Sequence, residues 1–490
     1  MQRQAVESRA AFQPISVAGR NLVVDVATCQ AFELDAIASE ALQTLVNMPD
    51  QEVVEELCSR SPAMKKATRE VEGLMSRGFF QPDKTSSVPP PLPLVARLRE
   101  LNLALTYRCT LRCRYCYTDS EQELANRQVK PDMSEEVIDV TLKWASEHCA
   151  KGAEPLNIWA GAVGEALLRK DILSYLAARA WEYTNATGKT FSPAVYTTNL
   201  TLAGDPAAYD CLADTRFKWR VSIDGPKHIH DAMRKFPDGR GSYEIVARSA
   251  AQLVQLKPAE KLGAAATITG AHPHITEIFL HLYEMGFRNI TLKPVRVNAE
   301  EPFAVNRQTL GGVKQGYSDF IEFLLRQDDQ DLLEYLKTIW HQDDFFGRFI
   351  LRVLGHGKMV YRCGAGKWAV GVDTNGDIYP CPPMIGLSQA RIGSVFTGIS
   401  EEAQRLYCED LLITRKQMCK DCWARYFCGG GCYHAALLIN ERVDLPEACD
   451  CELTRHLIEL AVYTAARLRE EHPTVLDALT AHHRTSHSHS

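Results

Sequence analysis

The chain has 490 residues, of which 46% are hydrophobic and 24% charged, and its formal net charge is −6. These values are typical of a folded protein of about three domains, and they exclude a disordered or collagen-like chain. The acidic balance provides no basic field for nucleic acid, and no apolar run reaches the roughly 18 residues of a membrane span. The beginning, MQRQAVESRAAF, lacks the apolar stretch of a secretion signal, so we expect a cytoplasmic protein with no nucleic-acid or membrane partner.

Residues 1–82 predict a small winged-helix-like domain. In FQPISVAGRNLVVDV, two β-branched segments flank AGRN, a pattern that predicts a hairpin. Three segments with apolar residues three and four positions apart follow and predict helices: ELDAIASEALQTLV, DQEVVEEL and AMKKATREVEGLM. Residues 83–97 contain four prolines and predict an extended linker.

From 98 to 310, short apolar strands alternate with amphipathic helices. The expected strands are LNLALT, LNIWA, PAVYTT, KWRVSI, GAAATIT and NITLKPV, with helices such as SEEVIDVTLKWASEH and HITEIFLHLYEMG between them. This alternation requires a parallel sheet, because parallel strands need long crossovers. Six strands are too few for a closed eight-stranded barrel. We therefore predict a partial (β/α)6 TIM-like barrel within an α/β fold, with active residues at the carboxyl ends of its strands.

The rest of the chain divides into three segments. Residues 311–350 predict a helical bridge, 351–455 a cysteine-rich and glycine-rich domain of poor periodicity, and 456–490 a C-terminal helix with a flexible tail. In the cysteine-rich domain, bound metal would have to replace part of the hydrophobic core.

Sixteen cysteines are unusual for a reducing compartment unless some of them bind metal or act in catalysis. Five are isolated in the sequence and are interpreted as small buried hydrophobic residues: Cys29, Cys58, Cys149, Cys211 and Cys408. The others form two groups. The first is Cys109, Cys113 and Cys116, and the second is Cys363, Cys381, Cys419, Cys422, Cys428, Cys432, Cys449 and Cys451.

The first group has the spacing C-x3-C-x2-C in TYRCTLRCRYCYTDS, directly after the first expected strand. Three thiolates can hold an iron-sulfur cluster and leave one iron open, whereas zinc would need a fourth ligand nearby. The motif resembles that of the radical S-adenosylmethionine (radical SAM) superfamily, whose loop holds a 4Fe-4S cluster that chelates this cofactor. The resemblance implies reductive cleavage of SAM to a 5′-deoxyadenosyl radical. It makes Cys109, Cys113 and Cys116 the catalytic cluster ligands and places Tyr115 beside the adenine.

The segment WAGAVGEALLRKDI resembles the GGEPLL segment of that family. The resemblance implies that Gly164 and Glu165 lie near the methionine amino group of SAM. Val163 stands where the family has its first glycine and Ala166 where it has proline, and glycine is what allows the backbone to approach a cofactor closely. This departure motivates a non-catalytic alternative, in which the chain is an iron-sulfur scaffold or regulator.

Two later segments imply further cofactor contacts. TTNLTL resembles the family's TNG stretch and implies contacts from Thr198 and Asn199. VSIDGPKHIHDAMR implies contacts from Ser222 and Arg234 with the ribose or carboxylate of SAM, and a guanidinium suits a carboxylate because it pairs in a bidentate manner. Asp224 is interpreted as a residue that organises the turn before Gly225.

The second group contains eight cysteines, enough for two fully ligated clusters. Its spacing is C-x12-G-x4-C, then C-x2-C-x5-C-x3-C, then C-x-C. This resembles the SPASM domain of radical enzymes that modify peptides and proteins, and implies two auxiliary 4Fe-4S clusters; the alternative is a pair of zinc knuckles. By the family pattern the first cluster is held by Cys363, Cys381 and Cys432, and the second by Cys419, Cys422 and Cys428. We assign Cys449 to the first cluster and Cys451 to the second; otherwise the first cluster has an open site.

The N-terminal hairpin and helices resemble the recognition element of enzymes that make ribosomally synthesised and post-translationally modified peptides (RiPPs). That element holds the leader of a precursor peptide as an added strand. Together the resemblances imply an enzyme, a radical SAM peptide-modifying oxidoreductase (RiPP maturase) that forms a carbon-sulfur (thioether) or carbon-carbon crosslink. They imply SAM and three 4Fe-4S clusters as cofactors, and the precursor peptide and an electron donor such as flavodoxin or ferredoxin as partners. The alternative enzyme is an anaerobic sulfatase-maturase-like dehydrogenase, which does not need the N-terminal domain.

Overall fold

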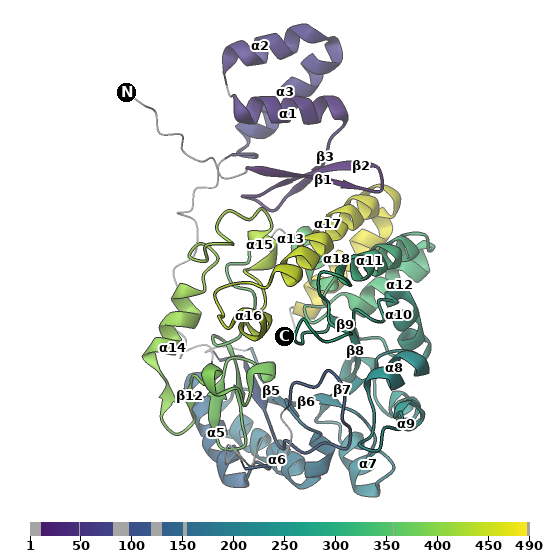
Figure 1. The fold of residues 1–490 in the computed structure, drawn as a ribbon, viewed down its shortest axis with the longest axis vertical. Helices are drawn as coiled ribbons and strands as arrows, with labels where there is room; N and C mark the ends of the chain where they lie inside the picture. Colours follow the sequence, from purple (N-terminus) through teal and green to yellow (C-terminus); the bar gives the residue numbers. More distant parts are fainter. Residues whose placement is uncertain are drawn as a thin grey trace.

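The computed structural model describes residues 11–48, 50–81, 98–118, 130–149, 154–355 and 357–487. The predicted linker 83–97 lies outside these ranges, and nothing is described of the side chains beyond residue 481. Figure 1 shows the N-terminal sheet and helices at one end of the molecule and a larger α/β body below them.

The N-terminal unit begins with a hairpin of β1 (Phe12–Val17) and β2 (Arg20–Asp25), and β3 (Ala31–Glu33) pairs with β2. Ala18 and Gly19 form the turn with φ of 49° and 79°, the left-handed conformations that a two-residue hairpin turn needs. The helices are α1 (Ala36–Asn47), α2 (Gln51–Arg60) and α3 (Pro62–Ser76). The predicted hairpin and helices are therefore present, and β3 is an addition.

The N-terminal sheet is buried on both faces. Val23 packs with α1, α2 and α3, whereas its neighbours Leu22 and Val24 belong to the core of the large body. This is the alternation of a strand, in which successive side chains point to opposite faces. The hairpin lies on α17 (Ala448–Glu471), and Arg20 forms ion pairs with Glu470 and Glu471 of that helix. The N-terminal unit thus packs against the body (Figure 1).

The body contains the predicted barrel strands, each parallel to the next. They are β4 (Glu100–Leu103), β5 (Leu156–Ala160), β6 (Phe191–Thr198), β7 (Lys218–Ser222), β8 (Leu262–Ile268) and β9 (Ile290–Pro294). The helices that follow these strands are α5 (Glu135–His148), α6 (Lys170–Thr187), α7 (Pro206–Ala213), α8 (Lys227–Met233), α9 (Tyr243–Leu256) and α10 (Ile275–Glu284).

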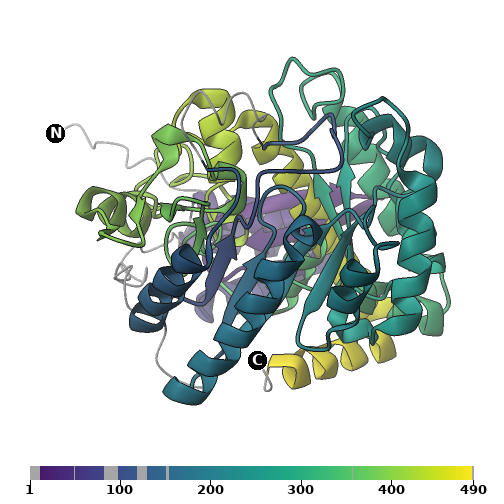
Figure 2. The same cartoon turned by 90° about the horizontal axis from the view of Figure 1, so that it is seen from below.

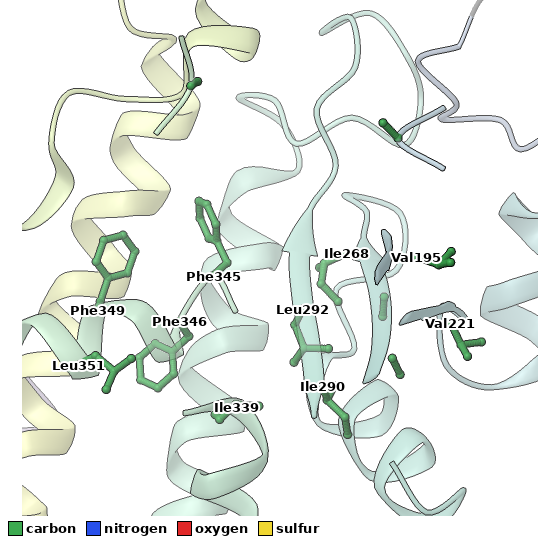
Figure 3. Packing of buried hydrophobic residues seen from close by; sticks show 14 of the residues in the cluster. Val195, Val221, Ile268, Ile290, Leu292, Ile339, Phe345, Phe346, Phe349 and Leu351 are labelled. Atoms are coloured by element: carbon green, nitrogen blue, oxygen red, sulfur yellow. The ribbon is translucent and has the colours of Figure 1, made fainter. Parts of the chain in front are cut away.

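Alternation along the strands separates an apolar face from a polar one. Val221, Ile290 and Leu292 are buried in the hydrophobic core, and Figure 3 shows Leu292 beside Ile268, with Val221 on the far side of Ile268. The residues that alternate with these point to the other face of the sheet. There the Nζ atom of Lys293 lies 6.0 Å from the centre of the Tyr196 ring. The apolar face fixes the register of the sheet, and the polar face is free for chemistry.

The C-terminal region extends the same sheet, which the sequence did not predict. Strand β10 (Ala369–Val372) pairs in parallel with β4, and β11 (Asp377–Tyr379), β12 (Gly393–Ser394) and β13 (Gly398–Ile399) follow in antiparallel order. In the described part of the chain the sheet therefore has ten strands, most of them parallel. Figure 2, seen from below, shows the green C-terminal region beside the blue beginning of the sheet.

The remaining helices connect the regions. They are α11 (Leu310–Leu325), α12 (Asp329–Ile339), α13 (Gly347–Gly355), α14 (Glu401–Arg405), α15 (Arg425–Cys428), α16 (Tyr433–Asn440) and α18 (Pro473–His487). Helices α13 and α17 run across the predicted boundaries after residues 350 and 455 and so join neighbouring segments. Among helices in the described ranges, none has the length and apolarity needed to cross a bilayer.

Candidate active site

The loop after β4 carries the first cysteine group at the carboxyl end of the parallel strands. Glu165 donates its backbone N–H to the Arg108 carbonyl at 2.9 Å, which ties the loop to the segment after β5. Arg112 donates its backbone N–H to the Lys235 carbonyl at 2.7 Å, which ties it to the segment after α8. Two of the thiols are half-buried and Cys116 is exposed. The loop is therefore held from two sides while its thiols stay accessible.

Gly164 allows the backbone to approach this loop closely. Its φ is +67°, and a Cβ there would lie 2.2 Å from the Thr106 carbonyl oxygen and 2.7 Å from that of Arg108. Val163 and Ala166, the residues that depart from the family pattern, are both buried in the core. Of the two glycines in the GGEPLL segment of the family, the chain therefore retains the one that this close contact requires.

Glu165 connects the carboxyl ends of β5 and β6. Its carboxylate accepts the backbone N–H of Asn199 at 2.7 Å and the Thr198 hydroxyl at 2.8 Å. Burial raises the pKa of Glu165, and these donors act against that rise. The Asn199 side-chain amide lies 3.5 Å from Cys109 Sγ, and burial raises the pKa of this thiol to about 12. The predicted cofactor residues Glu165, Thr198 and Asn199 therefore form one hydrogen-bonded unit that reaches the first cysteine.

The Tyr115 hydroxyl stands between a cation and an anion. Arg234 Nη1 donates to it at 2.7 Å, and the hydroxyl donates to the Asp224 carboxylate. Burial raises the pKa of Tyr115 well above its usual value, against the opposing effect of Arg234. Asp224 also accepts the Thr267 backbone N–H at 3.0 Å, and Ser222, two residues before it, is buried at the end of β7. The sequence suggested only a turn for Asp224, because no motif places it beside Tyr115.

Arg234 has a donor available for a ligand. Its Nε atom is buried and, within the described ranges, has no hydrogen-bond partner. Leaving a buried guanidinium donor unsatisfied costs free energy, and a carboxylate is the partner whose geometry it matches. SAM carries such a carboxylate. The three thiols and the unpartnered Nε of Arg234 therefore fit a cluster-bound ligand that carries a carboxylate, as SAM does.

The second cysteine group separates into two sets, of which the first auxiliary set is Cys363, Cys381 and Cys432. Burial raises the pKa of Cys381 well above its usual value, and the neighbouring Cys432 and Cys363 raise it further. These residues come from the segment before β10, the segment after β11 and the start of α16. The structure thus brings together three of the four cysteines that the sequence assigned to this cluster.

The second auxiliary set is Cys419, Cys422, Cys428 and Cys451. Burial raises the pKa of Cys419 to about 11, with Cys428 and Cys422 adding to the rise and Lys416 opposing it. Burial also raises the pKa of Cys451, and Cys428 again contributes. The structure thus brings together all four cysteines that the sequence assigned to the second cluster.

The beginning of α17 orients Cys449 differently from its neighbours Asp450 and Cys451. Successive helical residues point about 100° apart, so neighbours face different sides. Cys451 faces the second auxiliary set, and Asp450 accepts the Cys432 backbone N–H at 3.3 Å, on the side of the first set. Cys449 instead lines a surface cavity of about 730 Å³ and another of about 700 Å³, both with Arg307. The geometry therefore points Asp450, rather than Cys449, toward the first auxiliary set.

The cysteines do not converge on single points. Within the described ranges, no three His, Cys, Asp or Glu side chains stand where they could hold one metal ion. A tetrahedral zinc site needs sulfur ligands about 2.3 Å from one ion. A 4Fe-4S cluster places its own atoms between its ligands, so its thiolates stand further apart.

The chain is an α/β protein with a mostly parallel sheet and a three-cysteine loop at the carboxyl ends of its strands, an arrangement that resembles radical SAM enzymes with a SPASM domain. No protein-family model matches the chain. The cysteine-type anaerobic sulfatase-maturating enzyme of Clostridium perfringens is 25% identical over 355 residues, which cover 66% of this chain and 85% of that protein. The serine-type enzyme of Bacteroides thetaiotaomicron is 22% identical over 348 residues, covering 66% and 80%.

Solved structures are also similar to this chain in fold. Histidine-tagged anSMEcpe with bound AdoMet covers 80% of this chain and 98% of its own, with a TM-score of 0.60 at 18% identity. Native anSMEcpe with bound AdoMet and the Cp18Cys peptide covers 78% and 99%, with a TM-score of 0.56 at 16% identity. The predicted resemblance to radical SAM enzymes with a SPASM domain is confirmed.

Proposed function

We propose that the chain is a radical SAM maturase that modifies a ribosomally made precursor peptide by forming a thioether or carbon-carbon crosslink. The observation that carries this proposal is the cysteine loop, where Asn199 approaches Cys109 and the Tyr115–Arg234 pair stands at the same strand ends. The similarity to sulfatase-maturating enzymes supports radical chemistry on a protein or peptide.

The residues around the loop have separate roles in this proposal. The three thiolates would hold a 4Fe-4S cluster, and SAM bound there would supply the radical chemistry. Arg234 pairs with the SAM carboxylate through its free Nε. Asn199 donates to the Cys109 sulfur, a contact of the kind that adjusts the reduction potential of a cluster. Tyr115 is fixed by its two hydrogen bonds, and its ring would contact the adenine of bound SAM.

The β3 edge of the N-terminal sheet is suited to a leader peptide. Leu34 donates its backbone N–H to the Asn21 carbonyl at 3.0 Å, so the even-numbered residues at this end of the sheet bond inward to β2. In an antiparallel pair the intervening residues point their N–H and C=O groups the other way. The backbone groups of Ala31 and Glu33 therefore face outward, where an added strand can pair with them.

The β1 edge is less suitable. Val26 donates its backbone N–H to the Ala11 carbonyl at 3.1 Å, so residues 12, 14 and 16 face outward there. Residue 14 is proline, which has no N–H to donate. We therefore place the leader on β3, with the substrate portion of the peptide directed to the cysteine loop.

The test is product analysis with reconstituted enzyme, SAM and a precursor encoded by a short reading frame beside the gene. Electrons come from reduced flavodoxin or ferredoxin, the donor class that we propose. The expected products are methionine, 5′-deoxyadenosine and a peptide lighter by two hydrogens that carries a crosslink. Cleavage of SAM with every candidate peptide left unchanged contradicts the proposal.

A second candidate is modification of a sulfatase, because this chain is similar to the sulfatase-maturating enzymes of Clostridium perfringens and Bacteroides thetaiotaomicron. A sulfatase-derived peptide and the leader-bearing precursor are offered to the enzyme in the same reaction. Oxidation of the sulfatase peptide, with no change in the precursor, favours this second function.

A further inference from the structure

In the described part of the chain, four arginines gather beside the second cysteine group around two phenylalanine rings. We call Arg296, Arg348, Arg352 and Arg362 the arginine cluster. The guanidinium carbons of three of them lie 5.1, 5.2 and 5.4 Å from the centre of the Phe345 ring, and that of Arg352 lies 5.5 Å from the Phe349 ring. Figure 3 shows both rings within the buried core.

Separate parts of the chain supply these side chains. Arg296 follows β9, Arg348 and Arg352 stand one turn apart on α13, and Arg362 directly precedes Cys363. No sequence motif connects them, so only the fold reveals the cluster. Arginine keeps its positive charge even when buried, which makes the gathering electrostatically unfavourable by itself.

The hydrogen bonds of the cluster supply little negative charge. Arg296 forms an ion pair with Asp450 at 3.0 Å. Arg348 and Arg352 donate to backbone carbonyl oxygens at 3.0 and 2.6 Å, and these oxygens carry no net charge. Rings interact favourably with cations but do not neutralise them.

Two neighbouring carboxylates are engaged elsewhere. Asp343 pairs with an arginine of β7 at 2.5 Å. Asp344 accepts backbone N–H groups of Gly347 and Leu292 at 2.6 and 2.8 Å. The cluster therefore contains more positive charge than the carboxylates around it compensate.

Three guanidinium nitrogens of the cluster are buried without a hydrogen-bond partner among the described residues: Nε of Arg296, Nε of Arg352 and Nη2 of Arg362. Arg352 and Arg362 are only 7% and 3% exposed. Arg362 reaches the second auxiliary set, since its Nη1 lies 3.7 Å from Cys428 Sγ. A protonated thiol carries no charge, whereas a cluster-bound thiolate does. Buried donors of this kind call for an anion at the cysteines.

We propose that the arginine cluster is the counter-charge of the auxiliary iron-sulfur clusters and holds their reduction potentials above that of the cluster on the barrel loop. This inference rests on the proposed function, because it takes both auxiliary sets as cluster ligands. Reduction adds one negative charge to a cluster, so fixed cations stabilise its reduced form and raise its potential. At the barrel loop, by contrast, the charge of Arg234 is offset by Asp224 through Tyr115.

The test replaces one arginine at a time with methionine, which keeps much of the apolar stem and removes the charge. Arg348→Met and Arg352→Met are the test variants. Arg288→Met is the matched control, because Arg288 also stacks on a ring, 3.8 Å from the centre of Tyr283, but stands before β9, at the opposite end of that strand from Arg296. Each is made in a parent that lacks the barrel cysteines (C109A/C113A/C116A), so that only auxiliary clusters are titrated. The readouts are midpoint potential, iron retention and the melting temperature of iron-free protein.

In both test variants we expect a more negative potential and faster loss of iron, while the iron-free protein melts at the same or a higher temperature because repulsion is relieved. The control leaves all three readouts unchanged. If the midpoint potential and the iron retention are unchanged in both test variants, the inference is wrong. Equal destabilisation of loaded and iron-free protein also overturns it, since the arginines then serve packing alone. Absence of iron from the parent is a separate result, which overturns the auxiliary clusters of the proposed function itself.

Discussion

The two cysteine groups stand on regions with different kinds of order. The first group, in the loop after β4, stands beside parallel strands of four to eight residues, whose apolar face packs in a continuous core. The C-terminal region has β11, β12 and β13 of three, two and two residues, and helices α14 and α15 of five and four. The comparison teaches that long strands and a continuous apolar face order the first region, whereas the second contributes residues such as Ile413 and Phe427 to the same core from short elements and loops.

The largest expected effect comes from removing the barrel thiols. The variant C109A/C113A/C116A should form no 5′-deoxyadenosine above background, because these thiols alone hold the cluster that cleaves SAM in the proposed function. The assay is chromatography of the nucleoside products, and Cys149→Ala, at an isolated half-buried cysteine, is the control. Cleavage of SAM by the triple variant would remove the barrel loop from the chemistry.

The two cysteines at the start of α17 should differ in effect. Cys451→Ala is expected to lose the second auxiliary cluster, about four iron atoms per chain, together with the crosslinked product. Cys449→Ala is expected to keep both, because Cys449 lines the surface cavities. Iron assays and peptide mass spectrometry measure the difference. Equal losses in the two variants would restore Cys449 as a ligand.

A smaller effect is expected at the N-terminal sheet. Ala31→Pro removes an outward N–H of β3 without breaking its pairing with β2, and should weaken leader binding by about tenfold if one main-chain hydrogen bond is lost. Ser16→Pro on the β1 edge is the matched control. Titration of labelled precursor measures both affinities, and equal weakening by the two variants would argue against a β3 site. A point variant is preferable to deletion, because Ile15, Leu22 and Val24 contribute to the main core.

The smallest effect concerns the parallel sheet in iron-free protein. Burial raises the pKa of Glu100, at the beginning of β4, from 4.5 to about 7. Below pH 4.5 the carboxyl is protonated in both the folded and unfolded states; between 4.5 and 7 the unfolded chain ionises first, so stability falls as pH rises. Glu100→Gln should therefore stabilise the protein by about 1 to 3 kcal/mol at pH 8 and by little at pH 4. Urea unfolding at both pH values measures the stabilisation. An equal gain in stability at pH 4 and pH 8 would contradict the raised pKa of Glu100.

The sequence predicted the regular parts of the fold well. Strand and helix periodicities located β4 to β9, and polar residues at helix starts, such as Asp35, Asp50 and Ser61, act as caps. It did not predict the pairing of β10 with β4. Strands of two to four residues carry too little periodicity, and Ala369 meets Glu100 only through the tertiary fold.

The site was predictable where chemistry requires fixed spacing. Cysteines that wrap a cluster from one loop have short, fixed spacings, and the first group and the run Cys419, Cys422 and Cys428 follow such spacings. The role of Asp224, the orientation of Cys449 and the arginine cluster were not predictable in this way. Each depends on which helix face or strand end meets another, and such contacts between distant segments leave no fixed spacing in the sequence.

The iron content of the unmodified chain and of C109A/C113A/C116A tests the account most directly. If the two regions hold their metal separately, the unmodified chain should bind about twelve iron atoms and the triple variant about eight, because one four-iron cluster of three is lost. Elemental analysis of anaerobically reconstituted protein gives both values and reports zinc at the same time. Stoichiometric zinc in the unmodified chain, or loss of all iron from the triple variant, would contradict the account.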